Sequence, residues 1–492
     1  MTLAIVLTPA LAGVAALLIN WDKARRKLLV AAAAAHSILV GSMWLEGPSR
    51  DQSLYFALDP LGLYFITITS TLFMAASIYG ADYLAREDKH RRPDFEDGSL
   101  FSNQPEKFFT GFLLLFLSAM SFVAASRHLG MIWIAIECTT LVSAPLIYFH
   151  RRLPALEAMW KYLLVCSVGI ALALLGVFSM ATAAVKAGGP QASLSLAGLA
   201  SLAGSMDHAW LKMAFIFLFV GFGTKMGLAP FHMWLPDAHG ESPSMVSALL
   251  SGSLLNCAFL GILRTHQTLL AAGMADFTGP IFISFGLFSM LAAAIFIIRQ
   301  EDFKKTLAYS SVEHMGILAL GVGIGGAGVF GAMLHVAAHS LTKASLFMTA
   351  GNILGYFRTK NPDMVKGAIK ALPVSGILWV GGFMAITGAP PFPTFISEFT
   401  ILKAAVDGGY LFTAFGYLFL LAVIFIGMAV AFLPMAYGDP TAPSNFNIRT
   451  ESSLSYLPPA ILLLCGLTLT FYMPQAFIDT LHQTAAMLGG GL

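Results

Sequence analysis

Two charged side chains stand inside long apolar stretches of this 492-residue chain. Lys225 follows the apolar run that begins at Met213, and Glu137 has apolar residues on both sides. A charge at the depth of a lipid bilayer costs roughly 2.5–3.5 kcal/mol, so it usually serves the movement of protons or ions. The alternatives are a lysine that reaches the membrane surface and a protonated glutamate bonded to a backbone carbonyl. We predict that Lys225 and Glu137 take part in proton translocation.

Three proton-accepting side chains share one face of a later apolar run. His335, His339 and Lys343 are spaced four residues apart, so they stay close to one face of a helix. This stripe predicts a path for protons, although each histidine taken singly could be a hydrogen-bonded packing residue. Zinc metalloproteases place two histidines at the same spacing, but the glutamate that is their general base is missing here. We therefore predict no metal site.

Proline residues interrupt two of the apolar runs close to ionisable side chains. Proline removes a backbone donor and clashes with the preceding turn, so it kinks or splits a helix. Broken membrane helices with ionisable neighbours are typical of ion and proton sites in transporters. His314 and Glu398 join the predicted proton-translocating residues, and helix breaks are predicted at Pro230, Pro390 and Pro391.

Three further polar residues receive accessory roles: Lys161, His239 and Asn256. Lys161 opens an apolar run, and its ammonium could instead extend to the membrane surface. His239 lies in the polar stretch after the first proline break. Asn256 interrupts the next apolar run. Because an amide does not titrate, Asn256 can only hold water or bridge neighbours by hydrogen bonds.

The composition is that of a polytopic membrane protein, since 57% of the residues are hydrophobic and only 11% are charged. Soluble domains carry about 25% charged residues, and a run of about 20 apolar residues can cross a bilayer. The net charge of +2 gives no reason to expect a nucleic-acid partner. The four cysteines stand singly in apolar runs, which fits neither an iron–sulfur cluster nor a zinc site. We predict that this chain itself holds no cofactor.

The apolar runs predict an all-α fold of about fourteen transmembrane helices. The connecting segments then alternate between two faces. One face, here called the basic face, carries 19 of the 28 lysines and arginines, and the other carries five. The positive-inside rule places the basic face in the cytoplasm and both termini outside. The basic face is made of the segments near residues 23–27, 86–107, 151–152, 299–305, 358–370 and 449.

An internal repeat links GLAPFHMWL at 227–235 with GAPPFPTFI at 388–396. Each puts a proline break inside a span near an ionisable residue, and the two breaks are five predicted helices apart. An odd number of helices per repeat forces the two copies into opposite orientations. We predict two inverted five-helix repeats with helices 7 and 12 broken. The chain then divides into 1–107 (helices 1–3 and a cytoplasmic loop), 108–265 and 278–436 (the two repeats), and 437–492 (a loop and helix 14).

The stretch KMGLAPFHMWLPDAHGESPS at 225–244 resembles the lysine-bearing signature of the antiporter-like subunit family. That family includes subunits of respiratory complex I, Mrp-type cation/proton antiporters and energy-converting hydrogenases. The resemblance covers the predicted helices 3 to 14 and implies that Glu137 pairs with Lys225. Complex I subunits commonly have a lysine where this chain has Asn256. The chain therefore most resembles the hydrogenase-linked branch, the component F group of hydrogenase-4.

The resemblance implies a proton-translocating, non-catalytic membrane subunit of a redox-driven complex in a bacterial inner membrane. The expected complex is a group 4 membrane-bound nickel–iron hydrogenase of the formate hydrogenlyase type. The alternatives are a complex I subunit of the M or N type and the D-type component of a Mrp-type sodium/proton antiporter. Expected partners are the bilayer, other membrane-arm subunits and a peripheral cytoplasmic redox module. Those partner subunits would carry iron–sulfur clusters and nickel–iron or flavin.

Overall fold

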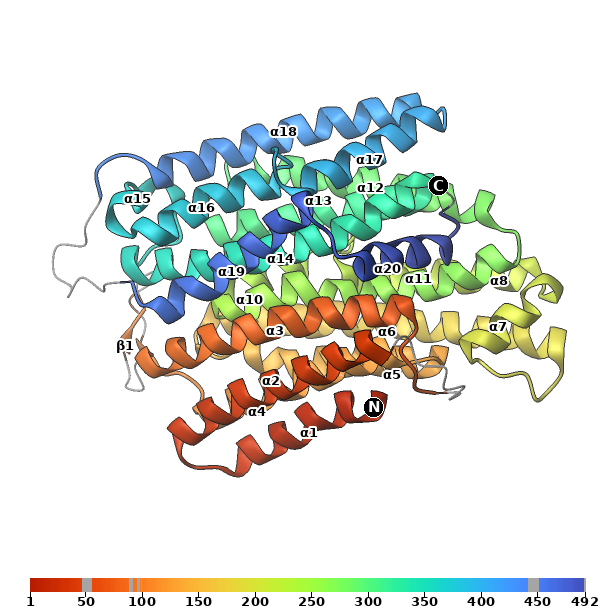
Figure 1. The fold of residues 1–492 in the computed structure, drawn as a ribbon, viewed down its shortest axis with the longest axis horizontal. Coiled ribbons are helices and arrows are strands. Elements are labelled where there is room, and N and C mark those ends of the chain that lie inside the picture. Colours follow the sequence, from red (N-terminus) through yellow and green to blue (C-terminus); the bar gives the residue numbers. More distant parts are fainter. Residues whose placement is uncertain (47–54, 88–91, 95–97, 99, 441–450, 491–492) are drawn as a thin grey trace.

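The computed structural model describes residues 1–46, 55–87, 92–94, 98, 100–440 and 451–490 (Figure 1). Parts of the predicted loop 84–107, and Arg50 and Arg449 of the charge count, lie outside these residues. Two short strands, β1 (Arg92–Pro93) and β2 (Leu100–Phe101), pair in antiparallel fashion with Arg92 opposite Phe101. Almost everything else in regular structure is helical.

The helices up to residue 271 are α1 (Thr2–Leu18), α2 (Asp22–Glu46), α3 (Pro60–Arg86), α4 (Glu106–Ala125), α5 (Leu129–Ile147), α6 (Leu153–Gly188), α7 (Leu196–Leu202), a 3-10 turn (Ala203–Ser205), α8 (His208–Met226), α9 (Trp234–Glu241), α10 (Ser244–Leu249), a π-helical turn (Leu250–Leu254) and α11 (Leu255–Ala271). The helices that follow are α12 (Ala275–Ile297), α13 (Phe303–Ile324), α14 (Ala327–Phe357), a 3-10 turn (Pro362–Met364), α15 (Ala368–Ala371), α16 (Pro373–Ile386), α17 (Pro393–Asp407), α18 (Leu411–Ala436), α19 (Ser453–Phe471) and α20 (Gln475–Ala486).

The prediction of an all-α polytopic membrane protein is confirmed. Eleven helices of the described chain are long and apolar enough to cross a membrane, with residues 244–271 counted as one helix. The three remaining predicted spans also correspond to helices. Of these, α1 and α16 are shorter than the eleven, and α14 carries the polar stripe. The number fourteen therefore stays a prediction.

Helix α14 lies in the middle of the bundle, where it contacts α10, α13, α16, α17 and α19. The helices run side by side across Figure 1, and both termini lie toward the same end of them. Residues 331–350 of α14 are all buried. The stripe of His335, His339 and Lys343 therefore lies in the protein interior, where ionisable groups of a membrane protein pair with one another or serve a path.

Two helices are interrupted inside the bundle. Gly227 ends α8 with a φ of 82°, a left-handed conformation that glycine adopts without steric cost, and α9 follows after a short turn. Between α16 and α17 the chain turns at Gly388, whose φ is 65°. The peptide bonds 229–230 and 390–391, both before proline, are cis. The interruptions thus lie at the predicted prolines, next to buried ionisable side chains.

A buried ion pair joins α3 to α11 at the end of the bundle opposite the basic face. Asp59 accepts a hydrogen bond from the backbone N–H of Gly62 at 2.8 Å, and Arg264 donates to both Asp59 oxygens at 2.6 Å. Burial alone would raise the pKa of Asp59. The charge and hydrogen bonds of Arg264, with the Gly62 N–H, outweigh burial and hold that pKa below its ordinary value.

The substitution Asp59→Ala is expected to lower the free energy of unfolding by about 3–5 kcal/mol, because Arg264 would stay buried without its counter-charge. The folded pKa is the lower one, so this stabilisation is present above the ordinary aspartate pKa of about 4 and is lost as the pH falls through the folded value. Thermal unfolding in detergent at several pH values measures both effects. Asp439→Ala, at an exposed pair with Lys370, is the control, and equal melting of the two variants would contradict the prediction.

Candidate functional site

Two hydroxyl groups hold the ammonium of Lys225. The lysine lies in the last turn of α8 and is fully buried, so it does not reach the membrane surface. Its Nζ donates to Thr140 Oγ1 at 2.6 Å and to the hydroxyl of Tyr162 at 2.5 Å. The Nζ also lies 4.5 Å from the centre of the Tyr162 ring, whose face attracts cations. These contacts stabilise the charged form of Lys225, although its ammonium forms no ion pair with a carboxylate of the described chain.

Thr140 bridges Glu137 and Lys225, the two residues that the family resemblance pairs with each other. Thr140 lies one turn after Glu137 on α5, donates to Glu137 Oε2 at 3.2 Å and accepts from Lys225. Ser167 of α6 donates to Glu137 Oε1 at 3.1 Å. The register of α5 against α8 puts the threonine between the charges, and no ion pair of the described chain joins the two directly. Glu137 itself is partly exposed on α5.

Lys161 lies at the basic face, and its neighbour Tyr162 points inward. Lys161 is 48% exposed and pairs with Glu157 at 2.7 Å and with Asp237 at 3.0 Å. The fully buried Tyr162 contacts Lys225 and lies 2.6 Å from Ser143 Oγ. The sequence had pointed to the lysine of this pair. Tyr162 shares the buried face of α6 with residues 166, 169 and 173, but nothing in the sequence singled out its hydroxyl group.

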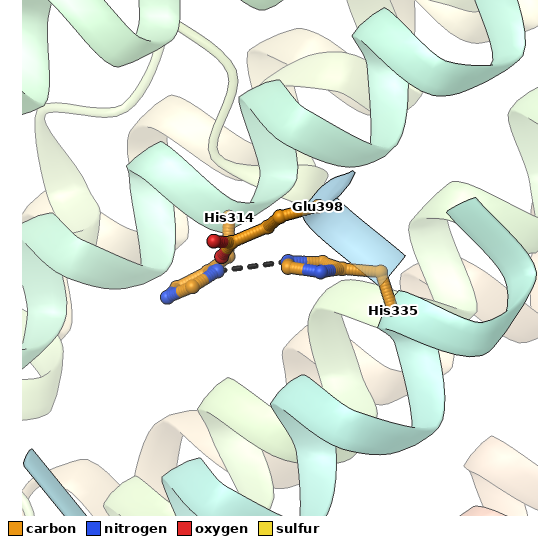
Figure 2. Close-up of side chains that lie close together, drawn as sticks. All are labelled: His314, His335 and Glu398. Atoms are coloured by element: carbon orange, nitrogen blue, oxygen red, sulfur yellow. Dashed lines mark hydrogen bonds between the residues drawn. The ribbon is translucent and has the colours of Figure 1, made fainter. Parts of the chain in front are cut away.

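Three histidines from α13 and α14 meet α17 in the second half of the chain. His314 Nδ1 lies 2.8 Å from His335 Nε2, and His335 Nδ1 lies 2.8 Å from Ser397 Oγ. Figure 2 shows the carboxyl group of Glu398 beside His314. The ring of His339 lies 5.0 Å from that of His314, centre to centre. The structure thus brings together the four residues predicted here and adds Ser397, which the sequence reasoning missed.

Several atoms of this cluster are buried without a hydrogen-bond partner in the described protein: His314 Nε2, both ring nitrogens of His339, and Glu398 Oε1. Buried polar atoms normally bind protein groups or ordered water, so the cluster suits water molecules that relay protons. Ligand atoms of His314, His335 and Glu398 lie within 4.8 Å of one another. Both ring nitrogens of His335 are hydrogen-bonded, however. The three residues therefore offer fewer free ligand atoms than a structural zinc site needs.

Lys343 is linked to the histidine cluster through Glu313, a residue that the sequence-based set did not include. Lys343 Nζ donates to the backbone carbonyl of Leu307 on α13 at 2.7 Å. The ammonium of Lys343 attracts the carboxylate of Glu313, and the carboxyl groups of Glu313 and Glu398 repel each other when both are charged. The sequence did contain a signal for Glu313, since a carboxylate directly before His314 in an apolar run is as unusual as the histidine itself.

The accessory residues Asn256 and His239 lie where the two halves of the chain meet. Asn256 Nδ2 donates to the Oγ of Ser340 at 2.8 Å. Ser340 follows His339 on α14. The amide therefore bridges α11 to the polar stripe without carrying a proton. His239, near the end of α9, is fully buried and its ring lies 5.6 Å from that of Phe347 on α14.

The break between α16 and α17 fixes the position of Glu398. A Cβ atom on Gly388 would lie 2.0 Å from Glu398 Oε2. Gly388→Ala is therefore expected to displace that carboxyl group, in addition to about 1–2 kcal/mol of strain from the left-handed backbone. Proton translocation should fall while the chain still assembles with its partners. Gly41→Ala, which adds a Cβ into open space, is the control. Unchanged translocation in Gly388→Ala would show that the position of Glu398 is unimportant.

Comparison with known proteins places this arrangement in one family. Residues 126–425 match the family described as NADH:quinone oxidoreductase/Mrp antiporter, TM. The chain is 34% identical to a hydrogenase-4 component F homolog of Methylacidiphilum infernorum (isolate V4), over 91% of this chain and 92% of that relative.

Two solved structures share the fold. A subunit of an archaeal respiratory complex, the membrane-bound sulfane sulfur reductase, superimposes with a TM-score of 0.85 at 18% identity, over 99% of this chain and 98% of that one. A subunit of respiratory complex I from Thermus thermophilus gives a TM-score of 0.81 at 21% identity, over 100% of both chains. With the match over residues 126–425, the chain is a member of the NADH:quinone oxidoreductase/Mrp antiporter family of membrane proteins.

Proposed function

We propose that this chain is the proton-translocating membrane subunit of a multi-subunit, redox-driven complex. The observation that carries the proposal is a buried row of titratable groups through both halves of the chain. Lys225 begins the fully buried part, Lys343 lies on the central helix, and the histidine cluster ends at Glu398. Hydroxyl groups of Thr140, Tyr162 and Ser397 bond to members of the row. Burying titratable groups at this depth costs free energy, so such groups usually serve a function.

The bridged contact between Glu137 and Lys225 suits a switch. Glu137 is partly exposed, so a neighbouring subunit that carries a cation can reach it. When such a cation attracts the carboxylate, Lys225 keeps only neutral hydroxyl partners and releases its proton more readily. The proton then passes through water to Lys343 and through Glu313 and the histidines to Glu398. The residues of this chain hold and transfer protons only.

The complex that we propose is a group 4 membrane-bound nickel–iron hydrogenase of the formate hydrogenlyase type. The identity of 34% to a hydrogenase-4 component F homolog supports this choice. Neighbouring membrane-arm subunits would cover Glu137, and a peripheral module would carry the iron–sulfur clusters and nickel–iron. The chain would lie in a bacterial inner membrane with its basic face in the cytoplasm and both termini outside. Segments 108–265 and 278–436 would be the inverted repeats.

Purification of the tagged chain from its native membranes tests the proposed complex. Hydrogenase and iron–sulfur subunits should be recovered with it, and the recovered complex should move protons when it turns over in proteoliposomes. Recovery with NADH-oxidising subunits would favour a complex I subunit of the M or N type. Recovery with Mrp-type membrane subunits alone would contradict the redox assignment and favour a sodium/proton antiporter.

A further inference from the structure

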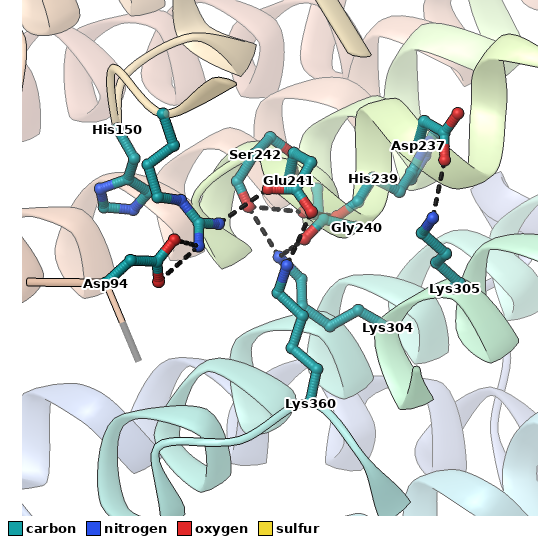
Figure 3. A network of polar contacts seen from close by, with 12 residues as sticks. Asp94, His150, Asp237, His239, Gly240, Glu241, Ser242, Lys304, Lys305 and Lys360 are labelled. Carbon is teal, nitrogen blue, oxygen red and sulfur yellow. Dashed lines mark hydrogen bonds and ion pairs between the residues drawn. The ribbon is translucent and has the colours of Figure 1, made fainter. Parts of the chain in front are cut away.

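A buried group of charges fastens the last residue of α9 at the basic face (Figure 3). Glu241 accepts a hydrogen bond from Arg152 and another from Lys360, both at 2.7 Å. Arg152 and Lys360 are each 5% exposed, and Glu241 is 8% exposed. Arg152 also pairs with Asp94 at 2.7 Å. Arg152, Glu241 and Lys360 are called the junction triad below.

The junction triad joins three elements from both halves of the chain. Arg152 directly precedes α6, Glu241 ends α9, and Lys360 lies just after α14. Solvent screens a buried ion pair only weakly, and removing one partner leaves the other charge buried without compensation. The triad therefore fixes the end of α9 against the beginning of α6 and the end of α14.

A second carboxylate of α9 makes a similar contact nearer to water. Asp237 pairs with Lys161 of α6 at 3.0 Å and with Lys305 of α13 at 2.8 Å. These three side chains are 26%, 48% and 32% exposed. Ion pairs that water reaches contribute little to holding two elements together. The position of α9 therefore depends mainly on the junction triad.

The first residue of α9 lies against the Lys225 site. Trp234 is fully buried, and its indole N–H donates to the backbone carbonyl of Thr224 at 2.9 Å, directly before Lys225. The Trp234 ring lies 4.9 Å, centre to centre, from the ring of Tyr162. The hydroxyl of Tyr162 accepts from Lys225. Trp234 thus contacts both the backbone that leads into Lys225 and one of its two hydroxyl partners.

We propose that Glu241 is a positioning residue for the Lys225 site. An eight-residue helix is about 12 Å long and stiffened by its own hydrogen bonds, so a shift at Glu241 reaches Trp234. Helices α6 and α9 are joined at two levels, by Arg152 with Glu241 and by Tyr162 with Trp234. The junction triad thereby keeps Tyr162 on the ammonium of Lys225. The proposal rests on the proposed function, because this position matters only if Lys225 carries protons.

Two single variants and their combination test the positioning role in the intact complex. Glu241→Gln removes the charge that Arg152 and Lys360 share. Trp234→Phe removes the N–H that bonds to Thr224 but keeps an aromatic ring beside Tyr162. Each should lower proton translocation per assembled complex by up to about 100-fold, because small displacements of a reacting group slow its transfer steps. Proteoliposomes report translocation and redox turnover in the same sample, and the amount of assembled complex is measured separately.

The double variant separates positioning from a general loss of stability. If Glu241 acts through Trp234, the double variant should translocate no more slowly than the slower single variant. Independent effects would instead multiply. If Glu241→Gln does not assemble, Lys360→Gln takes its place, since it leaves Glu241 paired with Arg152. Asp237→Asn, on the same helix but nearer to water, is the matched control and should keep translocation.

Normal translocation per assembled complex in Glu241→Gln or in Trp234→Phe would overturn the positioning role. Losses that multiply in the double variant, or an equal loss in Asp237→Asn, would overturn it as well. In each of these cases an inactive Lys225→Ala complex would leave the proposed function standing. Normal translocation in Lys225→Ala would overturn both.

Discussion

Replacing Lys225 with alanine is expected to abolish proton translocation while the complex still assembles. The ammonium bonds to both Thr140 and Tyr162, so its loss leaves these hydroxyls with no proton to pass on. Positioned groups that transfer protons typically contribute about 100- to 10,000-fold to a rate. Translocation should therefore fall to the background leak. The measurement is the acidification or alkalinisation of proteoliposomes that contain the purified complex during redox turnover.

Lys161→Ala is the matched control for this variant. Lys161 lies on α6 next to Tyr162, but it is half exposed and bonded to surface carboxylates. Each of these two surface ion pairs is worth about 0–1 kcal/mol, and the change removes no buried carrier. Translocation should therefore stay close to that of the unmodified complex. Equal losses in Lys161→Ala and Lys225→Ala would show that the effect of Lys225 is not specific to a buried carrier.

Replacing Glu398 with glutamine is expected to stop protons at the far end of the row. Glutamine keeps the shape of the side chain, so the contact with Gly388 and the packing of α17 should be retained. Glutamine cannot gain or lose a proton near neutral pH, however. Glu398 Oε1 also has no hydrogen-bond partner in the described protein that could carry the proton instead. Translocation should fall by about 100-fold or more.

The control for Glu398→Gln lies on the same helix. Asp407 pairs with Lys403 near the end of α17, and both side chains are more than half exposed. Asp407→Asn should leave both proton translocation and thermal stability unchanged. If Glu398→Gln translocates at the normal rate, the row of proton carriers does not end at Glu398. Proton release in proteoliposomes, with redox turnover recorded in the same sample, separates a blocked path from an inactive complex.

Much of the fold could be predicted because its signals are rare events in a sequence. Lysine in an apolar run and proline inside a span seldom occur by chance, so Lys225, Pro230 and Pro390 marked the broken helices. The stripe on α14 followed from helical spacing alone. The count of spans could not be settled in the same way. A helix such as α14, enclosed by protein on all sides, does not have to be as apolar as one that faces lipid.

The hydroxyl groups of the site could not be predicted from the sequence. Serine, threonine and tyrosine are common in membrane helices, so Thr140, Tyr162 and Ser397 carried no signal of their own. Their roles depend on the register between helices, which the sequence does not contain. The same limit explains why the bridge between Glu137 and Lys225 was not predicted. Only the packing of α5 against α8 shows that Thr140 lies between them.

The number of protons moved per electron pair in a Lys343→Met complex tests the continuity of the buried row most directly. Lys343 is the one lysine of α14 and lies between the two halves, and methionine fills a similar volume without a charge. We expect electron transfer to continue with fewer protons moved than in the unmodified complex. An unchanged number of protons per electron pair would contradict a continuous row of carriers through both halves of this chain.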